Sequence, residues 1–187
     1  MTEDTVPASG EREKLDELWK LVDSGRSSPQ DRIDAATLAG KLGDRSAIPR
    51  VWRLMADEDE EVRYYGLQTL VLDLKAKTGE TADLCWRLLE RDRDEDVQSM
   101  AAACLGSIFL GTNRVDVFQR LAEKLRSSSI SGFVKGSIYG ALFSLAGRPP
   151  AEWPNLTGPR RVFQETDIDW QKVAELEDEV RRAALSG

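Results

Sequence analysis

A tryptophan-centred segment that occurs twice constrains the fold of this chain more than any other feature. The segment Trp52–Met55 recurs 34 residues later as Trp86–Leu89, and an acidic turn follows each copy. Apolar or small residues then step by four: Val62, Gly66 and Leu70 after the first turn, and Val97, Ala101 and Leu105 after the second. A period of this size, with two helices in each unit, is typical of an α-solenoid.

Apolar residues spaced three and four apart predict amphipathic helices along most of the chain. These helices are expected to begin near residues 11, 29, 46, 59, 81, 94, 114, 130 and 168. Ser28-Pro29 is a typical helix start, because the serine can cap the helix and proline suits its first turn. No segment alternates with period two. We therefore predict an all-α chain, a short right-handed α-solenoid of antiparallel helix pairs with about eight or nine helices and no sheet.

The repeated residues resemble HEAT repeats, in particular the short bacterial HEAT-like type also found in phycobilisome-lyase-like proteins. That pattern places acidic residues before Val-Arg, then a small residue and Leu-Gly, and opens the second helix with Ala-hydrophobic-Pro. Here Glu60–Arg63, Leu105-Gly106 and Ala47–Pro49 match it. The resemblance covers about residues 28–147 and implies that the second helices line a concave surface. Such repeats serve many binding roles, so it indicates a fold more than a function.

Three parts are expected along the chain. Residues 1–10 are small and polar, and we expect a disordered N-terminal lead. Residues 11–147 form the predicted HEAT-like solenoid. Residues 148–187 begin with a proline-rich loop and end in a helix, which we expect to cap the last repeat because an end repeat exposes its apolar face. The alternative is a detachable tail that binds a partner.

Composition and charge disfavour several functions. The chain of 187 residues has a net charge of −7, which argues against general binding to nucleic acid or to anionic membranes. The absence of histidine removes the commonest general base and metal ligand. Neither a signal peptide nor a membrane-length apolar run is expected. Cys85 and Cys104 are predicted to be reduced, buried thiols in a cytoplasmic protein.

Basic side chains on the second helices are the candidate partner-binding residues. We expect this surface to bind a protein partner through an acidic segment, because arginine pairs well with carboxylates. The alternative is a solvated helix face whose cations are balanced by Asp83, Glu90, Asp116 and Glu123. The candidate residues are Arg50, Trp52, Arg53, Arg87, Arg91, Arg120 and Lys124.

Three other features have a structural interpretation beside a functional one. The tryptophans Trp52 and Trp86 either pack between repeats or present their edges to a partner. The acidic run Asp92–Asp96 resembles the start of a calcium loop, but Val97 stands where that loop needs glycine, so helix capping explains it better. The glycines Gly132, Gly136 and Gly140 lie on one helix face, where another helix or the C-terminal segment is expected to pack closely.

No catalytic constellation, metal site or cofactor site is recognised. The sequence therefore predicts a non-catalytic protein-binding scaffold, such as an adaptor, a regulatory subunit or an inhibitor of the immunity type. The alternative is a HEAT-like enzyme, similar to HEAT-like DNA glycosylases or to phycobilin lyases. Glycosylases of this kind use aromatic side chains with a carboxylate in a basic cleft, and Trp52, Trp86 and Asp83 are the residues that would serve.

Overall fold

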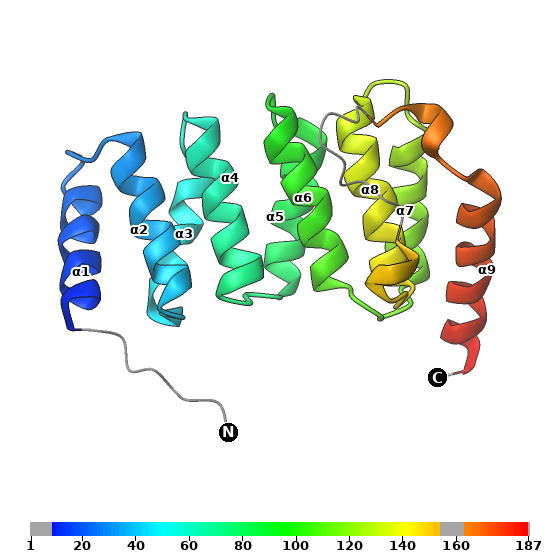
Figure 1. Ribbon diagram of the computed structural model, residues 1–187, viewed down its shortest axis with the longest axis horizontal. Helices are drawn as coiled ribbons and strands as arrows, with labels where there is room; N and C mark the ends of the chain where they lie inside the picture. Colours follow the sequence, from blue (N-terminus) through cyan, green and yellow to red (C-terminus); the bar gives the residue numbers. More distant parts are fainter. Residues whose placement is uncertain (1–8, 154–162, 187) are drawn as a thin grey trace. The chain divides into compact units, whose positions relative to one another are not determined.

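The computed structural model describes residues 9–153 and 163–186, and α-helices dominate these ranges (Figure 1). No strand occurs among the described residues, so the prediction of an all-α chain without a sheet is confirmed for them. The helices are α1 (Ser9–Asp23), α2 (Pro29–Lys41), α3 (Ile48–Arg53), α4 (Glu60–Gln68), α5 (Gly79–Arg91), α6 (Glu95–Ile108), α7 (Val115–Arg126), α8 (Gly132–Leu145) and α9 (Trp170–Ser186).

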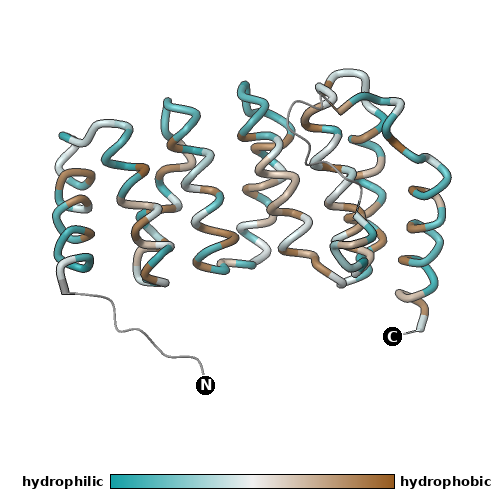
Figure 2. The backbone as a smooth tube through the Cα atoms, viewed as in Figure 1, coloured by the Kyte–Doolittle hydropathy of each residue, from teal (hydrophilic) through white to brown (hydrophobic). Residues whose placement is uncertain are grey.

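The chain divides into two compact units, with the boundary between Ala76 and Lys77. In the first unit α2 packs against α1 and α4, and α3 packs against α4. In the second unit α6 packs against α5 and α8, while α7 and α8 each pack against α9 and against one another. Hydrophobic and hydrophilic residues are interspersed along these helices, as expected where one face of a helix packs and the opposite face meets solvent (Figure 2).

Local capping residues begin several helices where the sequence predicted them. The Ser28 side chain accepts a hydrogen bond from the Asp31 backbone N–H, and the Asp31 carboxylate accepts one from the Ser28 N–H. In the acidic turns, Asp59 accepts from the Val62 N–H at 3.1 Å and Asp94 from the Val97 N–H at 3.0 Å. The prediction that these turns cap helices is therefore confirmed.

The helix expected to begin near residue 59 is not α-helical throughout. Regular α4 stops at Gln68, and a π-helical turn follows over Thr69–Asp73. This turn packs against α2 at Gly40, where an added Cβ would lie 2.8 Å from Asp73 Oδ2 and 3.1 Å from Thr69 Cγ2. A periodicity of 3.6 residues does not distinguish a π turn from an α-helix, so the sequence pattern did not predict it.

The C-terminal segment packs on the glycine-bearing face of α8. A Cβ on Gly132 would lie 2.1 Å from the Phe163 carbonyl oxygen, and one on Gly136 would lie 3.2 Å from the Phe163 ring. Lys135, on the same helix, is only 4% exposed and pairs with Glu165 at 3.3 Å. The expectation that the C-terminal segment approaches these glycines is confirmed at Gly132 and Gly136.

Both cysteines are buried in the second unit and neither is in a disulfide; Cys85 lies on α5 and Cys104 on α6. A hydrogen bond with the Cys85 thiol, together with burial, raises the pKa of Cys104 well above the ordinary range of a thiol. The Cys104 thiol is consequently a neutral packing element rather than a ready nucleophile.

Two predicted segments fall wholly or partly outside the described residues. The expected N-terminal lead, 1–10, overlaps the structure only at Ser9 and Gly10, which belong to α1. The expected proline-rich loop includes residues 154–162, which also lie outside. Before them, the half-buried Trp153 donates its indole N–H to the Arg148 carbonyl at 2.7 Å. None of the helices in the described ranges has the length and hydropathy that a membrane crossing requires.

Candidate functional site

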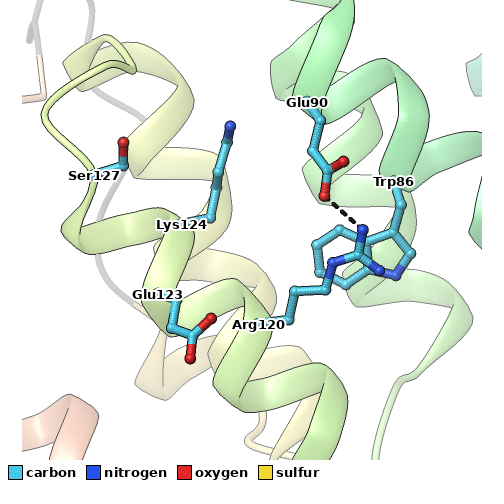
Figure 3. A pocket seen from close by; sticks show the side chains of 6 residues that line it. All are labelled: Trp86, Glu90, Arg120, Glu123, Lys124 and Ser127. Atoms are coloured by element: carbon cyan, nitrogen blue, oxygen red, sulfur yellow. Dashed lines mark hydrogen bonds and ion pairs between the residues drawn. The ribbon is translucent and has the colours of Figure 1, made fainter.

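A hollow of about 320 Å³ lies between α5 and α7 in the second unit (Figure 3). Two of the predicted binding residues, Arg120 and Lys124, line it together with Trp86. The remaining lining residues are Glu90, Glu123 and Ser127. Because Trp86 and Glu90 are four apart on α5, and Arg120 and Lys124 are four apart on α7, each pair shares one helix face.

Arg120 is held over Trp86 by two interactions. Its guanidinium carbon lies 4.0 Å from the centre of the Trp86 ring, and its Nη2 pairs with Glu90 Oε1 at 2.5 Å. Trp86 is 6% exposed, whereas the Arg120 side chain is 49% exposed. The tryptophan thus acts mainly in packing, as the structural interpretation predicted, and it orients a solvent-accessible arginine. A cation–π contact of this kind contributes about 0.5–2 kcal/mol.

Lys124 is the second cation of the hollow. It lies one helical turn beyond Arg120 and, within the described residues, has no ion pair. In Figure 3 the side chains of Lys124 and Glu123 point in different directions from α7, although both line the hollow. The hollow therefore contains one arginine that already has a carboxylate partner and one lysine that is available to another group.

The carboxylates expected to balance these cations have different partners. Glu90 pairs with Arg120, as the solvated-face interpretation requires. Asp116 instead accepts two hydrogen bonds from Arg114, at 2.6 and 2.8 Å, and these bonds lower the pKa of Asp116. Asp83 is exposed on α5 and has no ion pair among the described residues. Of the two cations of the hollow, consequently, only Arg120 is neutralised by an ion pair among the residues that the structure describes.

The other predicted residues of the second unit lie outside the hollow. Arg87 and Arg91 are exposed on α5, and neither has an ion pair within the described part of the chain. The structure gives them no common ligand position with Arg120 and Lys124.

In the first unit the predicted residues Arg50 and Arg53 converge on one carboxylate. Arg50 Nη2 lies 3.1 Å from Asp23 Oδ2, and Arg53 Nη2 lies 3.2 Å from Asp23 Oδ1. Arg50 also lies over the Trp19 ring, 5.6 Å from its centre. Trp52 is half-buried on α3. Trp19, rather than Trp52, is the tryptophan that accompanies these arginines.

Sequence reasoning did not assign Trp19 and Asp23 to a site. A signal was present, because an acidic residue follows each of two tryptophans by four positions: Asp23 after Trp19, and Glu90 after Trp86. On a helix this spacing places the carboxylate one turn beyond the indole, where an arginine on a packed helix can reach both.

No group of three or more histidine, cysteine, aspartate or glutamate side chains forms a candidate metal site in the ranges that the structure describes. Comparison of the chain with protein-family models, with curated proteins and with solved structures found no match.

Proposed function

We propose that this protein is a non-catalytic protein-binding scaffold that recognises an acidic segment of its partner. The observation that carries the proposal is Arg120, which is fixed over Trp86 while Lys124 lies one turn away, beside the hollow between α5 and α7. An adaptor, a regulatory subunit and an inhibitor of the immunity type all belong to this class.

The proposed architecture is a right-handed α-solenoid of HEAT-like helix pairs. It is supported by the 34-residue recurrence of the Trp-Arg-Leu segment and by the packing within each unit, where helices contact both the next helix and the next but one. In such an arrangement α3, α5 and α7 are second helices of their pairs, and the candidate cations lie on these helices.

The chemistry of the hollow favours a carboxylate ligand. The guanidinium group of Arg120 has a fixed plane over Trp86, so it loses little conformational freedom when it binds a carboxylate. Its present partner, Glu90, is 36% exposed, and exposed ion pairs contribute only about 0.2–1 kcal/mol, so a partner's carboxylate can share or replace it at small cost. Lys124 supplies a second positive charge for the next acidic residue of the segment.

The alternative of a HEAT-like enzyme has less support. A glycosylase-like site needs an accessible aromatic face in a basic cleft, whereas Trp86 is nearly buried and Arg120 covers it. Asp83, the carboxylate that such an enzyme would use, does not line the hollow. The net charge of −7 also opposes binding to duplex DNA. We propose the cytoplasm as the compartment, because both buried cysteines are reduced rather than joined in a disulfide.

Affinity capture with the full chain tests this function. The protein is immobilised and exposed to extract, and captured proteins are identified by mass spectrometry for the wild type and for R120Q/K124Q. The matched control is R181Q/R182Q, which removes two exposed cations of α9 that do not line the hollow. We expect a specific partner to be lost with R120Q/K124Q and retained with the control. Equal capture by both variants would contradict the proposal.

A further inference from the structure

The first unit repeats the arrangement of tryptophan, carboxylate and arginine found at the hollow, and there two arginines pair with the same carboxylate. In both units a tryptophan is followed four residues later by a carboxylate, and an arginine from the next-but-one helix lies over the tryptophan ring and pairs with that carboxylate. The first-unit residues are Trp19 and Asp23 on α1 and Arg50 and Arg53 on α3, which together we call the α1–α3 cluster.

The α1–α3 cluster differs from the hollow in its charge. Two guanidinium groups share the single carboxylate of Asp23, so the cluster has one unneutralised positive charge. The residues that line the hollow include as many carboxylates as cations, Glu90 and Glu123 beside Arg120 and Lys124, although only Arg120 and Glu90 of these four form an ion pair. Excess positive charge in an acidic chain marks a place where an anionic group is attracted.

The internal carboxylate of the cluster is weakly held. Asp23 is the last residue of α1, where the negative end of the helix dipole disfavours a carboxylate. Its side chain is 38% exposed, and those of Arg50 and Arg53 are 43% and 67% exposed. Ion pairs at such exposure contribute little stability, so an external carboxylate can displace Asp23.

The arginines keep a binding geometry when Asp23 leaves. Arg50 is supported by the ring of Trp19, which is 2% exposed and therefore fixed in position. Arg50 and Arg53 are three residues apart on α3 and present their groups on the same side. A carboxylate placed between them receives charge-assisted hydrogen bonds from both.

We infer that the α1–α3 cluster is a second binding site for an acidic side chain of a protein partner, and that Asp23 occupies this site as an internal competitor. The inference rests on the proposed function, since it assigns a second contact for the same kind of acidic segment. The inference adds that Asp23 weakens the binding of the acidic segment to this cluster, so removing the Asp23 charge should strengthen that binding.

The test uses a fluorescently labelled oligoglutamate peptide and the full chain, with anisotropy measured at low ionic strength, where exposed charges are least screened. D23N removes the competing charge with little change in shape. D16N is the matched control, because Asp16 is exposed on the same helix and has no ion pair among the described residues. We expect D23N to bind the peptide about three- to tenfold more tightly than the wild type, as one released charge-assisted contact allows.

Further variants identify the source of the gain. D23N/R50Q/R53Q should lose it, with circular dichroism showing that the helices remain. If D23N binds no better than D16N, the inference is overturned. If inorganic phosphate displaces the peptide from D23N and binds with an equal gain, the cluster is a general anion site and its assignment to a protein partner is overturned.

The same assay separates this inference from the proposed function. If R120Q/K124Q abolishes peptide binding and D23N leaves the affinity unchanged, only the inference about the second site fails. If D23N raises the affinity for the peptide and R120Q/K124Q does not change it, the hollow is not a binding site, whereas the inference about the α1–α3 cluster is supported.

Discussion

The close approach of α6 and α8 at Gly106 predicts a measurable cost for adding one methyl group there. In Gly106→Ala the new Cβ would lie 2.9 Å from Ala141 Cα, 3.1 Å from Ala141 Cβ and 3.3 Å from Ser144 Cβ. Carbon atoms in comfortable contact are about 3.5–4.0 Å apart. Because the nearest atom belongs to the backbone of α8, rotating a side chain cannot relieve the clash, and the two helices must separate by roughly half an ångström.

The expected magnitude follows from two opposing effects. Overpacking a tight helix contact costs about 1–3 kcal/mol. Alanine has a higher helix propensity than glycine, which returns about 1 kcal/mol. We therefore expect Gly106→Ala to lower the free energy of unfolding of the second unit by about 1 kcal/mol.

Urea unfolding followed by circular dichroism provides the measurement, with Gly79→Ala as the matched control. Gly79 opens α5 in the same unit, and an added Cβ there meets no heavy atom within 4 Å. The control should therefore be as stable as the wild type, or more stable by up to about 1 kcal/mol. If both glycine variants are equally stable, the reasoning about close packing at Gly106 is refuted.

Three other perturbations have expected outcomes. Glu165→Gln should lower the stability of the second unit by about 1–3 kcal/mol, because buried Lys135 loses its carboxylate partner. Adding Lys135→Met should recover most of this loss, and a Glu165→Gln variant as stable as the wild type would contradict the prediction. The pKa of Cys104 is raised in the folded state, so the folded thiol stays protonated at a pH where the unfolded thiol ionises. Above about pH 8.5 the unfolded state therefore binds fewer protons than the folded state. The free energy of unfolding should fall there by up to about 1.4 kcal/mol per pH unit. Cys104→Ala should show a shallower decline in pH-dependent urea unfolding, and an unchanged slope would count against the shift. Asp94→Ala should cost about 1 kcal/mol through loss of the cap on Val97, whereas the neighbouring Asp96→Ala should cost only a few tenths through the helix dipole; thermal unfolding distinguishes the two, and equal costs would rule out specific capping.

Helix positions and helix starts are the part of this structure that local sequence determines. Ser28 before Pro29, and Asp94 before α6, are caps whose partners lie three residues away. An interaction over three or four residues depends only on the residues in that stretch, so it can be predicted without knowing the fold. The recurrence of Trp52 at Trp86 likewise indicated repeated helix pairs, and the absence of alternating segments indicated no sheet.

The partners of the candidate site residues were a different matter. The sequence placed Arg50 and Arg53 on one helix, and Arg120 and Lys124 on another, but the balancing carboxylates expected from it did not include Asp23. Tertiary packing decided that Arg120 pairs with Glu90 and that both Arg50 and Arg53 pair with Asp23. Helix periodicity shows which residues share a face, whereas the register between packed helices decides which faces meet.

The glycines and the lysine of α8 show the same difference between what local sequence predicts and what tertiary structure supplies. Its sequence showed three glycines on one face and predicted a close neighbour, and only the folded chain identified Phe163 as that neighbour over Gly132 and Gly136. Nothing in the local sequence marks Lys135 as buried, yet in the fold it is 4% exposed and pairs with Glu165 of the returning C-terminal segment. Sequence by itself determined the helices and the faces they present; tertiary structure decided their contacts, because burial and pairing arise from segments that are distant along the chain.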